Sequence, residues 1–155
     1  MREGKTPKIG VLGGSGVYEI EGLEDMRWEP VHTPFGAPSD DLCIGRLDGV
    51  EMVFLPRHGR GHPVPPSDVN YRANIDALKR VGVTDIISVS AVGSLKEELP
   101  PGTFVVIDQF IDRTFAREKT FFTNGCAAHV GFSHPVAERL QAALSGACRT
   151  LNLPY

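Results

Sequence analysis

Residues 51–62 read Glu51-Met52-Val53-Phe54-Leu55-Pro56-Arg57-His58-Gly59-Arg60-Gly61-His62, an apolar run followed by a basic, glycine-rich turn. The run over 51–55 predicts a half-buried strand, which the proline and the glycines end. Loops at strand ends are where α/β sheets commonly bind ligands. The Arg57 guanidinium offers a fixed fork of donors for an oxyanion, and His58 can donate a second bond. The stretch therefore predicts a phosphate site, with a solvated basic turn as the alternative.

Further apolar runs on both sides of this stretch predict the other strands. They cover residues 8–12, 42–47, 83–92 and 103–111, with weaker strand character over 28–31. Asp48-Gly49 separates the run 42–47 from the run that follows it, and this dipeptide strongly indicates a two-residue hairpin turn. The run 83–92 is almost continuously apolar, which is typical of a strand buried on both faces of a sheet.

Two segments with helical periodicity complete the pattern. The first covers residues 67–81, with Ser67 as its predicted N-cap, and the second begins at Pro135. Strands that alternate with helices predict an α/β fold, a mixed β-sheet flanked by helices. A sheet of this kind often has another strand after such a helix, so the pattern of elements looks interrupted after residue 155.

Composition narrows the class of protein. The chain has 155 residues, 41% of them hydrophobic and 23% charged, which suits one soluble globular domain. Its net charge of −3 provides no general basic field for nucleic acid. No apolar run approaches the roughly 20 residues of a membrane helix, and the N-terminus lacks the pattern of a signal peptide. Cys43, Cys126 and Cys148 are an odd set at wide spacings, expected to be reduced and buried, so the cytoplasm is the expected location.

A glycine-rich stretch, Gly10 to Gly16, overlaps the end of the first predicted strand and closes it with a turn over 13–16. It does not fit the dinucleotide fingerprint, the P-loop or the nucleophile elbow. Its backbone N–H groups and the Ser15 hydroxyl are nevertheless suited to an anion, and a plain structural turn is the alternative.

Two other motifs leave alternatives open. Residues 88–94 end the run 83–92 in small side chains, which leave room for a flat ligand, although a serine there can equally be a satisfied core hydroxyl. His58 and His62 have the spacing of two metal ligands on a helix. The glycines between them disfavour a helix, so no metal site is expected.

Taken together, these segments resemble those of the 5′-methylthioadenosine phosphorylases, a branch of the trimeric purine nucleoside phosphorylase family. The matching segments, which cover nearly the whole chain in the family's order, are 9–16, 32–36, 57–60, 66–74, 90–95 and 107–114. The resemblance implies a nucleoside phosphorylase-like sheet, of which this chain forms the N-terminal half.

The resemblance also implies roles for individual residues. The implied phosphate-binding residues are Ser15, Arg57, His58, Ser90 and Ala91. The implied substrate-binding residues are Ala91, Val92, Gly93, His62 and His129, the last reaching the site of a neighbouring subunit. Arg57 and His58 are the catalytic residues that this chain would contribute, by positioning phosphate. No metal or organic cofactor is implied, and inorganic phosphate is a co-substrate.

The chemistry implied is reversible phosphorolysis of 5′-methylthioadenosine to adenine and 5-methylthioribose 1-phosphate. Phosphate attacks the anomeric carbon through an oxocarbenium-like transition state, comparable with glycoside cleavage. Two alternatives remain: a phosphorylase that acts on 6-oxopurine nucleosides, and a non-catalytic anion-binding domain. Family members are about twice as long, and their second half carries the residues that grip the purine. The resemblance therefore implies either that this chain is a fragment or that a second polypeptide completes the site, in a homotrimer or hexamer of the completed unit.

Overall fold

The computed structural model of the protein describes residues 7–14, 16–122 and 125–155. The chain divides into two compact units, Met1–Ala91 and Val92–Tyr155. The first unit contains a β-sheet and one helix, and the second contains one helix and long irregular segments. Ser15, one of the predicted phosphate ligands, lies outside the described residues.

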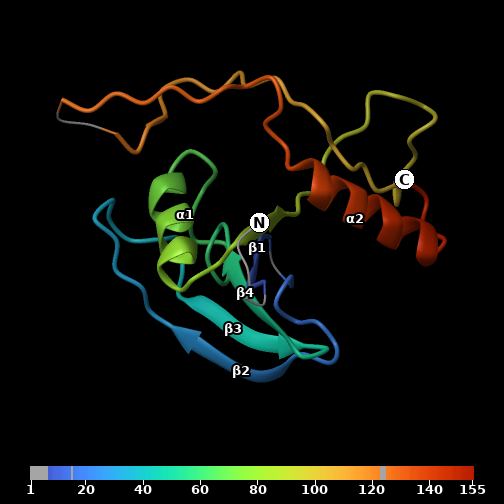
Figure 1. The fold of residues 1–155 in the computed structure, drawn as a ribbon, viewed down its shortest axis with the longest axis horizontal. Coiled ribbons are helices and arrows are strands. Elements are labelled where there is room, and N and C mark those ends of the chain that lie inside the picture. The colour runs from blue at the N-terminus through green and yellow to red at the C-terminus, as the bar shows by residue number, and fades with distance from the viewer. Residues whose placement is uncertain (1–6, 15, 123–124) are drawn as a thin grey trace. The chain divides into compact units, whose positions relative to one another are not determined.

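The sheet of the first unit has five strands of mixed direction (Figure 1). They are β1 (Ile9–Gly13), β2 (Glu24–Glu29), β3 (Leu42–Leu47), β4 (Val50–Pro56) and β5 (Asp85–Ser88). Their order across the sheet is β2-β3-β4-β1-β5. β1 runs parallel to β4 and β5, whereas β2, β3 and β4 are antiparallel neighbours. The predicted mixed α/β sheet is confirmed.

The turn between β3 and β4 confirms the predicted hairpin. Asp48 and Gly49 have positive φ values of 48° and 77°. Two successive residues with positive φ form the turn whose twist matches that of two antiparallel strands. The Arg46 guanidinium donates a hydrogen bond of 2.7 Å to the Gly49 carbonyl, and Leu47 pairs directly with Val50.

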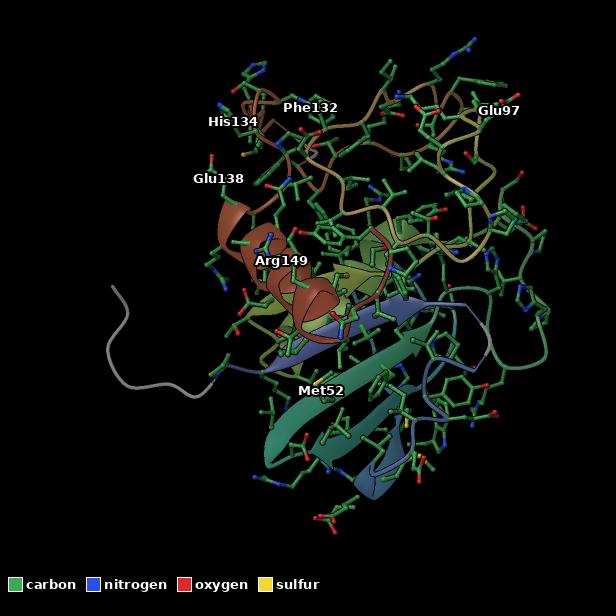
Figure 2. All side chains as sticks on the ribbon, turned by 90° about the vertical axis from the view of Figure 1, so that its right-hand side faces the viewer. Met52, Glu97, Phe132, His134, Glu138 and Arg149 are labelled. Atoms are coloured by element: carbon green, nitrogen blue, oxygen red, sulfur yellow. The ribbon has the colours of Figure 1, made fainter. Side chains whose placement is uncertain are left out.

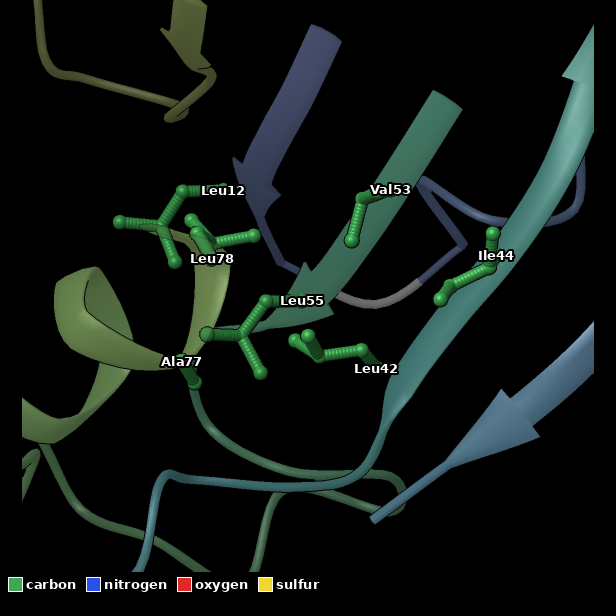
Figure 3. Close-up of a cluster of buried hydrophobic side chains, with 7 residues drawn as sticks. All are labelled: Leu12, Leu42, Ile44, Val53, Leu55, Ala77 and Leu78. Atoms are coloured by element: carbon green, nitrogen blue, oxygen red, sulfur yellow. The ribbon is translucent and has the colours of Figure 1, made fainter. Parts of the chain in front are cut away.

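Side chains alternate between the two faces of the sheet. One face packs against helix α1 (Tyr71–Arg80) and buries a cluster of seven residues, shown in Figure 3: Leu12, Leu42, Ile44, Val53, Leu55, Ala77 and Leu78. The other face buries Val11, Cys43 and Phe54. This alternation follows from the period of two in a strand. Because the strands pair in a fixed register, the position of each strand end is fixed, and so is the start of the loop that follows it.

Helix α1 begins later than predicted, because Asn70 rather than Ser67 is its N-cap. The Asn70 side chain accepts a hydrogen bond of 3.1 Å from the Ala73 N–H, and asparagine caps as well as serine does. Residues 66–68 form a turn instead. Gly82 ends the helix with φ of 86°, and its N–H and that of Val83 bond the carbonyls of the last turn, which is the Schellman arrangement.

The predicted strand over 83–92 is shorter in the structure, and it is not buried on both faces. β5 has four residues, because its one partner, β1, ends at Gly13. Beyond β5, Val89 is 45% exposed. A continuous apolar run indicates a hydrophobic segment, but the length of a strand depends on the partner that hydrogen-bonds to it.

The predicted strand over 103–111 is wrong. Among the residues that the structure describes in the second unit no strand is formed, so these backbone groups have no ladder to join. The Phe104 N–H instead donates to the Pro154 carbonyl at 2.9 Å. Cys126 is exposed, contrary to expectation, whereas Cys43 and Cys148 are buried as expected.

Helix α2 (Glu138–Thr150) begins three residues after Pro135, so the proline precedes the helix and does not open it. Its charges suit the helix dipole, with Glu138 in the first turn and Arg149 in the last, as Figure 2 shows. Neither helix of the described chain is long and apolar enough to cross a membrane.

Candidate anion-binding site

The carboxyl ends of the three parallel strands meet at one edge of the sheet. The Arg57 N–H, just after β4, donates to the Gly13 carbonyl at the end of β1 over 2.8 Å. The Val89 N–H, just after β5, donates to the Leu12 carbonyl over 2.9 Å. These two bonds hold the loops after β4 and β5 beside the glycine turn after β1. Ligands commonly bind at such an edge.

Arg57 and Ser90 meet at this edge, although 33 residues separate them. The Arg57 guanidinium Nη1 donates a hydrogen bond of 2.6 Å to the Ser90 hydroxyl. Ser90 and Ala91 are exposed, and Arg57 is half-buried. Within the described ranges, Arg57 forms no ion pair with a carboxylate. Its positive charge is therefore not neutralised by an acidic side chain, and an anion can supply that charge.

His58 is held on the same loop by two bonds to Val64. Its ring Nδ1 lies 2.9 Å from the Val64 carbonyl, and the Val64 N–H donates to the His58 carbonyl over 3.0 Å. Because a carbonyl only accepts, Nδ1 carries the proton in this contact. The Arg57 Nε donates to His58 Nε2 at 3.4 Å. The His58 ring therefore lies in direct contact with the Arg57 guanidinium.

The His62 ring stacks on the His58 ring, with ring centres 4.8 Å apart and planes within 15°. His62 thus lies beside His58, and it is exposed whereas His58 is half-buried. No group of three or more histidine, cysteine, aspartate or glutamate side chains suited to a metal ion exists in the part of the chain that the structure describes.

The second arginine of the loop has a different environment. Arg60 donates through Nε and Nη2 to both carboxylate oxygens of Asp40, at 2.8 to 3.1 Å. Burial acts to raise the pKa of the Asp40 carboxyl group, but the hydrogen bonds from Arg60 outweigh it and hold that pKa below its ordinary value. Sequence reasoning did not identify Asp40, because nothing in the sequence links two residues 20 positions apart.

The remaining predicted substrate-binding residues lie in the second unit. Val92 and Gly93 are exposed and follow Ala91 directly in the chain, and His129 is exposed in the segment before α2. Their roles stay predictions of the resemblance. The first unit by itself brings together Arg57, His58, His62, Ser90 and Ala91.

The chain is similar to known proteins in sequence and in fold. Residues 8–155 match the phosphorylase superfamily. The chain belongs to this superfamily. Within the phosphorylase superfamily it is 63% identical over 151 residues to the S-methyl-5′-thioadenosine phosphorylase of Rhodospirillum rubrum. It is 64% identical over 141 residues to the protein of that name in Cereibacter sphaeroides.

Solved structures of the phosphorylase superfamily share the fold. A methylthioadenosine phosphorylase from an antarctic soil metagenomic library aligns with a TM-score of 0.90 at 46% identity, over 96% of this chain and 52% of that one. The methylthioadenosine phosphorylase of Schistosoma mansoni in complex with adenine aligns with a TM-score of 0.86 at 44% identity, over 93% and 54% of the two chains.

The two bacterial relatives are matched over 97% and 91% of this chain, and over 51% and 49% of their own lengths. The chain thus spans about half the length of the curated relatives it matches.

Proposed function

We propose that the protein containing this chain cleaves 5′-methylthioadenosine by phosphorolysis, and that this chain provides the phosphate-binding side of the site. The names of the bacterial relatives support the reaction. The observation that carries the assignment to this chain is the contact of Arg57 with Ser90, beside His58, at the carboxyl edge of the parallel strands.

In the proposed reaction, a phosphate oxygen attacks the anomeric carbon of the ribose and forms a C–O bond. The C–N bond to the purine breaks, and its electron pair leaves with adenine, which takes up a proton. The other product is 5-methylthioribose 1-phosphate. Arg57 and His58 would hold the phosphate close to the positive charge that develops on the sugar. Such positioning and electrostatic stabilisation account for much of catalysis.

Other residues would complete the phosphate site and the nucleoside site. We propose that the Ser90 and Ser15 hydroxyls and the Ala91 N–H add hydrogen bonds to phosphate. We further propose the following substrate contacts: Ala91, Val92, Gly93, His62 and, in a neighbouring subunit, His129. Inorganic phosphate is then a co-substrate, and the proposed reaction uses no metal or organic cofactor.

The proposed assembly is a homotrimer or hexamer in the cytoplasm, in which residues outside 1–155, from the C-terminal half or from a second polypeptide, grip the purine. The relatives are about twice as long as the matched region, which supports a contribution from residues outside 1–155.

The test measures product formation from 5′-methylthioadenosine and from inosine by the complete protein, with and without phosphate. We expect phosphate-dependent release of adenine and a much lower kcat/KM for inosine. Comparable kcat/KM values would favour a 6-oxopurine enzyme instead. No cleavage of either nucleoside, with phosphate binding retained, would favour an anion-binding domain.

A further inference from the structure

The loop that carries Arg57 and His58 is anchored at its far end by an ion pair. Arg60 contacts Asp40 with its side chain and also through its backbone, because the Arg60 N–H donates to Asp40 Oδ2 at 2.6 Å. The Asp40 side chain is only 11% exposed. One carboxylate thus receives both a guanidinium fork and a backbone N–H from the same residue. Such bidentate, charge-assisted contacts fix geometry as well as adding energy.

An aromatic side chain supports the same arginine. The Arg60 guanidinium carbon lies 4.0 Å from the centre of the Trp28 ring, and Tyr18 packs edge-on against that ring at 5.3 Å. Asp41 is a more distant partner of Arg60, at 3.4 Å and in a more exposed position. Arg60 is therefore held between a carboxylate and an aromatic face.

The backbone of the loop also approaches the segment that contains Asp40. Gly59 is buried and has φ of +72°. A Cβ atom at Gly59 would lie 3.0 Å from the Ser39 carbonyl oxygen and 3.1 Å from Pro63 Cγ. Only glycine fits such an approach without strain.

The segment 35–41 is in turn fixed to the start of helix α1. The fully buried Asn74 accepts from the Ser39 N–H at 2.8 Å and donates to the Ser39 hydroxyl at 2.9 Å. Asn70 donates to the Phe35 carbonyl at 2.7 Å. Asp40 directly follows this anchored serine, so its carboxylate projects from a segment tied to the helix.

We propose that Asp40 is a positioning residue for the candidate phosphate site. It holds Arg60, and through Arg60 it holds the glycine-rich loop in the conformation that presents Arg57 and His58. The bond from the Arg57 N–H to Gly13 fixes the start of the loop, and the Asp40–Arg60 pair fixes the part after Gly59. Protein side chains that are already held in the binding geometry bind phosphate more tightly than mobile ones. The inference rests on the proposed function only in naming phosphate as the ligand.

The test compares Asp40→Asn with Asp41→Asn in the complete protein. Asparagine keeps the size of the side chain and removes the charge, and Asp41 is the matched control because it is more exposed and makes the longer contact with Arg60. We expect Asp40→Asn to raise the KM and the dissociation constant for inorganic phosphate about tenfold, with the KM for 5′-methylthioadenosine within about twofold of wild type. We expect Asp41→Asn to change each value by less than about twofold.

A second readout separates this inference from the proposed function. Amide hydrogen exchange of residues 57–62 without phosphate should become faster in Asp40→Asn and stay unchanged in Asp41→Asn. If wild type binds no phosphate, the proposed function fails, and the exchange result alone decides the positioning role. Unchanged exchange and unchanged phosphate affinity in a folded Asp40→Asn protein would overturn it. If that variant does not fold, phosphate affinity and amide exchange are measured in Arg60→Lys instead. Lysine keeps the positive charge but cannot make the bidentate contact with Asp40. Unchanged values there would overturn the proposal.

Discussion

Arg57 and Arg60 lie three positions apart on one loop, yet their surroundings differ in kind. Arg60 directs its guanidinium at Asp40 and stacks on Trp28, so the protein itself compensates its charge. Arg57 contacts a hydroxyl and an imidazole, and no described carboxylate pairs with it. The comparison shows that two arginines on one loop can differ in whether the protein itself compensates their charge. The acidic partner makes this difference, and that partner is distant in the sequence.

The largest effect is expected from removing Arg57, for which the described residues provide no acidic partner. Arg57→Ala should lower kcat/KM for phosphate by about 30- to 5,000-fold, equivalent to about 2–5 kcal/mol, because a charge-assisted bidentate contact is lost. Steady-state kinetics with varied phosphate measures this. Arg46→Ala is the control, since Arg46 is an exposed arginine of the β3–β4 hairpin that bonds Gly49. Equal effects of the two variants would place Arg57 among ordinary surface residues.

The anchored side of the loop is tested by adding one methyl group. Gly59→Ala should lower the free energy of unfolding by about 2–4 kcal/mol, because it combines positive φ with a close approach to the Ser39 carbonyl. Gly61→Ala should cost only about 1–2 kcal/mol, since Gly61 has φ of +77° but a Cβ there would meet nothing within 4 Å. Chemical denaturation of both variants gives the difference. Equal losses would mean that the contact with Ser39 contributes nothing.

A smaller effect is expected at the hydroxyl that Arg57 contacts. Ser90→Ala removes the acceptor at 2.6 Å from Arg57 Nη1 and one proposed donor to phosphate. The dissociation constant for phosphate should rise about two- to tenfold, the range for one hydrogen bond of about 0.5–1.5 kcal/mol. Calorimetric titration measures it, with Ser94→Ala as the control, because the Ser94 hydroxyl bonds the backbone of its own turn at Lys96. A change in the control as large as that in Ser90→Ala would contradict the assignment.

The smallest effect is confined to acidic pH. Hydrogen bonds from Arg60 hold the pKa of Asp40 below its ordinary value of 3.8, despite the opposing effect of burial. The resulting stability is fully present above pH 3.8 and is lost as the pH falls through the lower, folded-state pKa. The difference in unfolding free energy between wild type and Asp40→Asn should therefore be constant from pH 7 to about 5 and shrink below about 4. A difference that already falls between pH 7 and 5 would contradict the lowered pKa.

Local signals made part of this molecule predictable. Asp48-Gly49 encodes its turn in two adjacent residues, and the apolar run before Pro56 ends where the proline and glycines indicate. Arg57 and His58 were therefore placed correctly at a strand end. The small residues at the end of the run 83–92 likewise indicated a strand end, and Ser90 lies there, at the same edge as Arg57.

Other features depended on partners that are distant in the sequence. The run 103–111 is as apolar as a strand, but a strand also needs a neighbour for its backbone groups, and the periodicity of one segment carries no information about that neighbour. The same holds for Asp40, whose importance arises only once folding brings it to Arg60. The N-cap of α1 was missed for a simpler reason, since Ser67 and Asn70 are both good caps and only the turn at 66–68 decides between them.

The mixed direction of the sheet has a consequence for the order of folding. The β3–β4 hairpin closes over a two-residue turn, an event that takes microseconds in isolated hairpins. The ladder that joins β1 to β5 instead begins with contacts between Lys8 and Thr84, 76 residues apart, and such distant closure is slow. Arg57 therefore belongs to an early hairpin, whereas Ser90 reaches it only when the last parallel strand docks. On the ribosome, the candidate phosphate site can form only after residue 91 has emerged, so the proposed phosphate affinity would report the final step of assembly in this unit.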